Sequence, residues 1–154
     1  MIFLLCAVVL GTIAQAKPLH TPKLSIDKNN IKVWTYQDQQ NPVFLYKAET
    51  TYHAPIENAV SLILDIEHAV QWVPYMGSIK VLSRDDKKGE FTLYMVLDFP
   101  FPLKDRDLIV QGKMIKQPNG QISIKNKAIQ TGYPLNPNYV RLTDYQGDWT
   151  FQKL

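Results

Sequence analysis

Residues 90–107 read EFTLYMVLDFPFPLKDRD and decide the fold. Over residues 90–98 the side chains alternate with a period of two, which predicts a β-strand. Two prolines then interrupt the alternation, so residues 99–106 are predicted to form a loop before a second strand over 107–115. One face of the first strand is entirely apolar and consists of Phe91, Leu93, Met95 and Leu97.

The same reading, extended in both directions, predicts several more strands and few helices. Apolar residues spaced three and four apart predict a helix over 56–65, followed by a short helical piece over 66–72. Residues 17–30 contain two prolines and are predicted to be a lead-in with little packing. An α+β protein with a mainly antiparallel sheet is therefore expected. The further predicted strands are 31–36, 43–52, 78–83, 121–130 and 139–154, the last with a break at Gln146 and Gly147.

Composition limits the possible functions. The chain has 154 residues, of which 45% are hydrophobic, so it is long enough for one domain with an apolar core. A formal net charge of +3 is small for a protein that binds nucleic acid, and no nucleic-acid partner is predicted. The seven glycines are too far apart to form a nucleotide-binding glycine-rich loop.

The first sixteen residues resemble a secretory signal peptide. Residues 2–13 form an apolar run too short to cross a bilayer, and Ala14-Gln15-Ala16 matches a cleavage site. We therefore predict cleavage after Ala16 and export to the periplasm or the medium. A buried N-terminal strand is the alternative. Cys6 lies within the predicted signal, so the mature chain would have no cysteine for disulfides or metal binding.

Catalytic and metal-binding patterns are not found. The histidines, at positions 20, 53 and 68, do not have the spacing of metal ligands, and no serine has a nucleophile-elbow setting. Asp65 and His68 are three residues apart, which we interpret as a solvated helix end. The sequence therefore predicts no catalytic residue, no metal site and no cofactor.

Arg106 lies between two carboxylates, Asp105 and Asp107, where the predicted loop enters a strand. An anion-binding site is one interpretation, and an arginine that fixes the loop through a carboxylate is the favoured one. Adjacent side chains on a strand point to opposite faces, so the partner of Arg106 is predicted to be a more distant carboxylate. The candidates are Asp65 and Asp98.

Several short sequence motifs follow one another between residues 30 and 151. They are residues 31–34, 46–50 and 62–67, Trp72, Tyr94, the 99–107 stretch and residues 147–149. Their order and spacing resemble the START family of lipid-transfer domains. Residues 100–107 are similar to the family's most specific signature, two prolines followed by an Arg-Asp pair. Trp72, Arg106 and Asp107 are expected to be structural residues of this motif.

The resemblance implies a helix-grip fold, in which a curved antiparallel sheet wraps a long C-terminal helix and holds a lipid or sterol between them. START domains continue beyond the point that corresponds to Leu154, so this chain is expected to be a fragment without the grip helix. A shortened protein with an open groove is the alternative. The similarity is greatest to bacterial exported members, which implies a lipid carrier that acts without catalysis and contacts membranes transiently.

Such binding needs only apolar walls, because each buried methylene gains roughly 0.8 kcal/mol. The apolar face of residues 91–97 is the expected wall, and the opposite set, Tyr94 and Val96, is the alternative. The same face can instead pack on the helix of residues 55–65 as ordinary core. The expected ligand-binding residues are Phe91, Leu93, Met95, Leu97, Ile122 and Ile124.

Two other function classes are compatible with this sequence. A polyketide cyclase or aromatase of the same superfamily would need a buried acid or base, for which Asp98 and His53 are the candidates. An envelope module would use the apolar groove to bind a protein partner.

Overall fold

The computed structural model describes residues 22–38 and 41–153. The predicted signal peptide, residues 1–16, lies outside these ranges. The chain divides between His53 and Ala54 into an N-terminal unit and a C-terminal unit. The two units are described separately.

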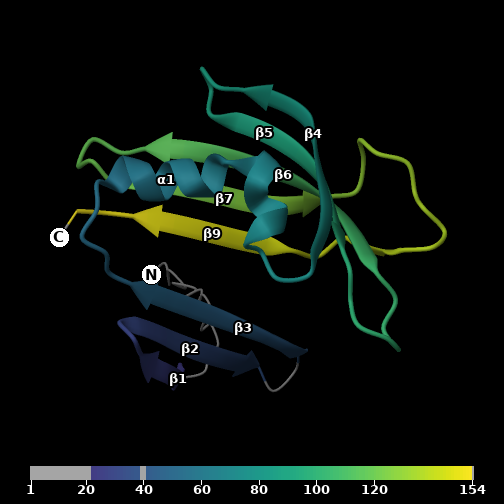
Figure 1. Cartoon of the computed structure of the whole chain (residues 1–154), viewed down its shortest axis with the longest axis horizontal. Coiled ribbons are helices and arrows are strands. Elements are labelled where there is room, and N and C mark those ends of the chain that lie inside the picture. The colour runs from purple at the N-terminus through teal and green to yellow at the C-terminus, as the bar shows by residue number, and fades with distance from the viewer. Residues whose placement is uncertain (1–21, 39–40, 154) are drawn as a thin grey trace, which may run out of the picture. The chain divides into compact units, whose positions relative to one another are not determined.

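The N-terminal unit is an antiparallel sheet of three strands, β1 (Lys23–Lys28), β2 (Ile31–Asp38) and β3 (Asn41–Thr50), in that order (Figure 1). The predicted pairing of residues 31–36 with 43–52 is confirmed. The prediction for residues 17–30 is wrong in part, because β1 lies within them. Asn29 and Asn30 have positive φ angles, which asparagine tolerates and which allow the tight turn from β1 to β2.

The C-terminal unit contains a larger, strongly twisted sheet with two short helices (Figure 1). Its strands follow the order β4-β5-β6-β7-β9, and β8 pairs with β6. The predicted helices are confirmed as an α-helix, α1 (Ile56–Leu64), and a 3₁₀-helix, η1 (Ile66–Gln71). The strands are β4 (Met76–Asp85), β5 (Glu90–Leu97), β6 (Arg106–Lys116), β7 (Ile122–Ile129), β8 (Val140–Leu142) and β9 (Gln146–Phe151).

The prediction of one long final strand over 139–154 is wrong. It is divided into β8, which runs parallel to β6, and β9, which runs antiparallel to β7. The break falls at residues 143–145, before the predicted position at Gln146 and Gly147. A parallel strand requires a connection that crosses over, and residues 130–139 supply it.

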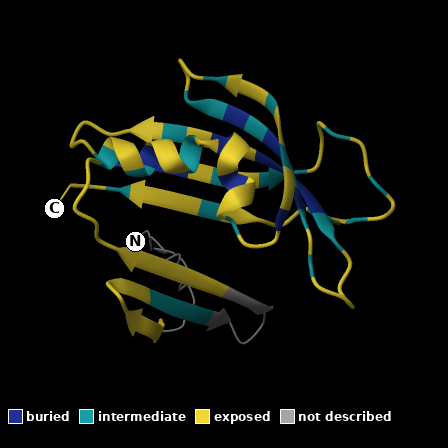
Figure 2. Cartoon of the chain, in the orientation of Figure 1, coloured by how far each residue is buried: buried dark blue, intermediate teal, exposed yellow. Residues whose placement is uncertain are grey.

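The sheet of the C-terminal unit has two different faces. Directly paired residues of antiparallel strands project to the same side, so the register assigns each residue to a face. We call the side that packs on α1 the helix face and the opposite side the outer face. Leu93 and its partner Val110 belong to the helix face, whereas Tyr94 and its partner Ile109 belong to the outer face. Burial is concentrated along β5 and β6 (Figure 2).

Candidate functional site

The helix face carries the residues predicted to bind a ligand. Four of them form one buried cluster with Val60 of α1 and Ile66 of η1. Met95 is partly buried and packs against this cluster, while Leu97 is half-buried at the end of β5. The face therefore packs on α1 as a core. The four clustered residues are Phe91, Leu93, Ile122 and Ile124.

The outer face contains a buried ion pair that the sequence analysis did not find. The Asp107 side chain is 1% exposed, and both of its oxygens accept hydrogen bonds from Arg141. Nε donates to Oδ1 at 2.8 Å and an Nη atom donates to Oδ2 at 2.8 Å. Parallel pairing of β8 with β6 sets Arg141 directly beside Asp107. These hydrogen bonds hold the pKa of Asp107 below its ordinary value.

Two tyrosines complete this cluster and attach the 130–139 crossover to the sheet. The Tyr94 hydroxyl donates to Asp107 Oδ2 at 3.0 Å, and the Tyr94 ring stacks on Tyr133 with centroids 3.9 Å apart. Burial, with the hydrogen bond to Asp107, raises the pKa of Tyr94 to about 12. Arg141 also donates to the carbonyl oxygen of Pro134 at 2.9 Å. The crossover is therefore fixed by the same arginine that neutralises Asp107.

The predicted partners of Arg106 are wrong. Among the described residues, Arg106 forms no ion pair with Asp65 or Asp98. Its guanidinium lies 4.5 Å from the centroid of Phe99 and donates to the carbonyl oxygen of Lys104 at 2.9 Å. Strand alternation separates it from Asp107, as expected, and gives the buried ion pair to the aspartate.

Trp72, expected to be a structural residue of the sequence motif, lies partly exposed at the surface. Trp72 is the residue that directly follows η1, and it is 41% exposed. Its backbone N–H donates to the carbonyl oxygen of Ala69 and ends η1.

The loop between β5 and β6 presents apolar side chains to solvent. Phe101 is 97% exposed, and Leu103 is also exposed. The base of the loop is held in place by Asp105, whose carboxylate accepts the backbone N–H of Phe99 at 3.1 Å. Phe99 also stacks on Tyr75, with centroids 5.5 Å apart. A fixed base thus holds an exposed apolar tip.

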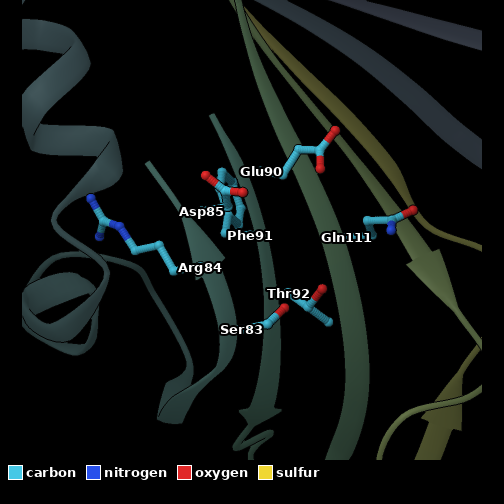
Figure 3. A pocket seen from close by; sticks show the side chains of 7 residues that line it. All are labelled: Ser83, Arg84, Asp85, Glu90, Phe91, Thr92 and Gln111. Atoms are coloured by element: carbon cyan, nitrogen blue, oxygen red, sulfur yellow. The ribbon is translucent and has the colours of Figure 1, made fainter. Parts of the chain in front are cut away.

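A small depression lies at the β4–β5 hairpin (Figure 3). Its volume is about 190 Å³, which is below the roughly 300–1,000 Å³ typical of small-molecule sites. Polar and charged side chains form most of its wall, so it does not match an acyl chain. The lining residues are Ser83, Arg84, Asp85, Glu90, Phe91, Thr92 and Gln111.

The remaining polar candidates lie at the surface. His68 Nδ1 and Asp65 Oδ1 are 2.7 Å apart at an exposed helix end, and this contact raises the pKa of His68. Asp98 and His53, the candidate acid and base of a cyclase, are both exposed. Within the described ranges there is no group of three His, Cys, Asp or Glu side chains placed to hold a metal ion. No helix in those ranges is long and apolar enough to cross a bilayer.

Several known proteins with similar sequence or structure are named as StAR-related lipid transfer proteins. The human mitochondrial StAR-related lipid transfer protein 7 is 24% identical over 127 residues, which cover 80% of this chain and 34% of that protein. An uncharacterised Pseudomonas aeruginosa protein is 24% identical over 130 residues, with 84% and 63% covered. The structure of a STAR-related lipid transfer protein fragment from Xanthomonas axonopodis is 25% identical, with a TM-score of 0.77, and the match covers 84% of this chain and 72% of that one. No protein-family model matches the chain.

The topology and these similarities define the fold of START domains, with a curved antiparallel sheet and few helices. The chain has the StAR-related lipid transfer fold, as the order of its sequence motifs predicted. It spans about a third of the length of the human relative that it matches.

Proposed function

We propose that the protein binds a lipid or another hydrophobic molecule on the helix face, without catalysis, and exchanges it with membranes. The observation that carries the proposal is the largely apolar helix face of β5, β6 and β7 in a START-type fold. Transfer of an acyl chain onto this face gains free energy through burial of its methylenes alone. The relatives named as lipid transfer proteins support the same function.

Lipid capture tests the proposal directly. The purified chain is incubated with vesicles of phosphatidylcholine and phosphatidylglycerol, separated from them, and extracted for mass spectrometry. We expect lipid to leave with the protein and to be passed on to acceptor vesicles. Protein that stays empty over a range of lipid classes would contradict the proposal, and capture of a protein partner in place of lipid would favour an envelope interaction module.

Membrane contact is proposed to occur through the exposed tip of the β5–β6 loop. Phe101 is exposed and apolar at a fixed loop, which suits insertion into the interface of a bilayer. We expect Phe101→Asp to weaken vesicle binding by about tenfold or more, since a charge replaces an inserted ring. Co-sedimentation with vesicles measures the change.

A matched variant separates insertion from a general charge effect. Ile115 is also a partly exposed apolar residue, and it lies at the opposite end of β6 from the loop. Ile115→Asp introduces the same charge and is expected to leave vesicle binding unchanged. Equal weakening by both variants would show that the loop has no specific role in membrane contact.

Export is part of the proposed function, because residues 1–16 match a secretory signal. Expression of the full chain in a bacterium, followed by fractionation and N-terminal sequencing, tests it. We expect mature protein that begins at Lys17 outside the cytoplasm. Recovery of uncleaved protein from the cytoplasm would contradict export and leave the lipid-binding proposal intact.

A cyclase or aromatase is not supported by any particular observation. The reaction would need a buried acid or base, whereas Asp98 and His53 are both exposed.

A further inference from the structure

A polar side chain, Asn126, interrupts the apolar run of β7 on the helix face. Asn126 lies within β7. The other β7 side chains on the helix face, between residues 122 and 128, are apolar: Ile122, Ile124 and Ala128. An apolar residue at position 126 would continue the pattern and pack with its neighbours. The amide is therefore an exception that packing does not explain.

Glycines flank Asn126 on both sides. Gly112 of β6 and Gly147 of β9 are its direct partners across the two ladders, so neither neighbouring strand places a side chain beside the amide. A Cβ atom at Gly112 would overlap the ring of Phe91 and lie 2.7 Å from Asn126 Oδ1. A Cβ atom at Gly147 would lie 2.6 Å from the Tyr145 hydroxyl, so the Phe91 ring and the Tyr145 side chain occupy the places beside the amide that the two glycines leave open.

The carbonyl oxygen of the amide is buried and has no donor. Asn126 Oδ1 accepts no hydrogen bond from any described residue. A buried acceptor without a donor is costly, and native proteins satisfy nearly all such atoms. Its neighbour, the Phe91 ring, is held by apolar packing alone, so an apolar ligand that displaces the ring can restore the lost contacts.

We propose that Asn126 is the polar anchor of the lipid site and that its Oδ1 accepts a hydrogen bond from the bound molecule. This inference rests on the proposed lipid-binding function and adds the chemical class of ligand. The oxygen requires a donor, so the preferred ligands carry a hydroxyl or an amide N–H next to a long apolar part. Lipids whose polar groups only accept hydrogen bonds are disfavoured, because they leave Oδ1 unpaired.

Two probes that differ in one donor hydrogen test the anchor. Oleyl alcohol and oleyl methyl ether have the same chain, and only the alcohol can donate. Each is titrated against the full chain by displacement of a fluorescent fatty acid. We expect the wild-type protein to prefer the alcohol by roughly five- to tenfold, the scale of one neutral hydrogen bond.

Substitution of the amide then removes the preference. Asn126→Leu is similar in size and lacks the acceptor, so the two probes should bind within about twofold of each other. Asn126→Ala makes the same comparison with a side chain smaller than the amide. Gln111→Leu is the control, because it removes an amide from the outer face, next to Gly112, and should keep the preference. Thermal unfolding verifies that each variant is folded.

The outcomes separate the anchor from the function on which it depends. Equal binding of both probes to the wild-type protein overturns the anchor and leaves lipid binding intact. A preference that persists in Asn126→Leu and Asn126→Ala also overturns it, because the donor then finds another acceptor. Failure of both probes to bind the wild-type protein contradicts the proposed function itself.

Discussion

Replacement of Arg141 by methionine should lower the free energy of unfolding by about 3–5 kcal/mol, the cost of removing one partner from a buried ion pair. Asp107 would remain as a buried carboxylate whose two oxygens have lost their charged donor. The variant also loses the hydrogen bond that ties Arg141 to Pro134 in the crossover. Urea unfolding measures the change.

Arg106→Met is the matched control for this experiment. Arg106 is adjacent to Asp107 in sequence. Its guanidinium contacts the ring of Phe99 and has no carboxylate partner among the described residues. We expect a loss of at most about 1 kcal/mol. A larger loss of stability for Arg106→Met than for Arg141→Met would show that the arginine of the sequence signature, and not Arg141 of β8, stabilises the fold.

The same ion pair predicts how stability depends on pH. The pKa of Asp107 is lowered in the folded state, so the pair adds stability that is fully present above the ordinary carboxyl value of 3.8. This stability is lost as the pH falls through the lower folded-state pKa. The advantage of wild type over Asp107→Asn should therefore be constant near neutral pH and should shrink in strong acid. An advantage that does not change with pH would show that charge is not its source.

Local patterns predicted most of the fold because each element has its own periodicity. The alternation over residues 90–98 predicted β5 close to its observed bounds. The spacing of three and four over residues 56–65 did the same for α1. The same periodicity cannot tell whether neighbouring strands run parallel or antiparallel. The segment 139–154 therefore read as one strand, although β8 and β9 pair with different partners.

The buried ion pair was missed for the same reason. Asp107 and Arg141 are far apart in sequence, and they meet only because the 130–139 crossover returns β8 beside β6. Alternation did show that Asp107 faces away from Arg106. A search for a cation near the start of another predicted strand, on the face of Asp107, would have included Arg141.

The apolar residues that β5 and β7 contribute to the helix face were predicted, whereas those of β6, Leu108 and Val110, were not, and the role of the face could not be predicted. A face that packs on a helix and a face that holds a lipid have the same apolar pattern, since both exclude water. The structure places Phe91, Leu93, Ile122 and Ile124 against α1. Whether a ligand shares that face is decided by an experiment that separates binding from stability.

Leu93→Trp is expected to abolish lipid binding and to lower the free energy of unfolding by about 1–3 kcal/mol. Leu93 is 6% exposed in the cluster that contacts Val60, so a larger ring forces this packing apart. If the lipid lies between α1 and the sheet, the ring also occupies its space. Displacement of a fluorescent fatty acid and urea unfolding measure the two effects on the same sample.

Val96→Trp supplies the comparison that makes the result specific. Val96 lies on the same strand and is likewise 6% exposed, but it packs on the outer face with Tyr94 and Ile109. We expect it to lose a similar amount of stability and to bind lipid normally in its folded fraction. Normal binding by folded Leu93→Trp would place the ligand elsewhere than the helix face. Loss of binding in both variants would show that instability causes the loss, because only Leu93→Trp fills the proposed site.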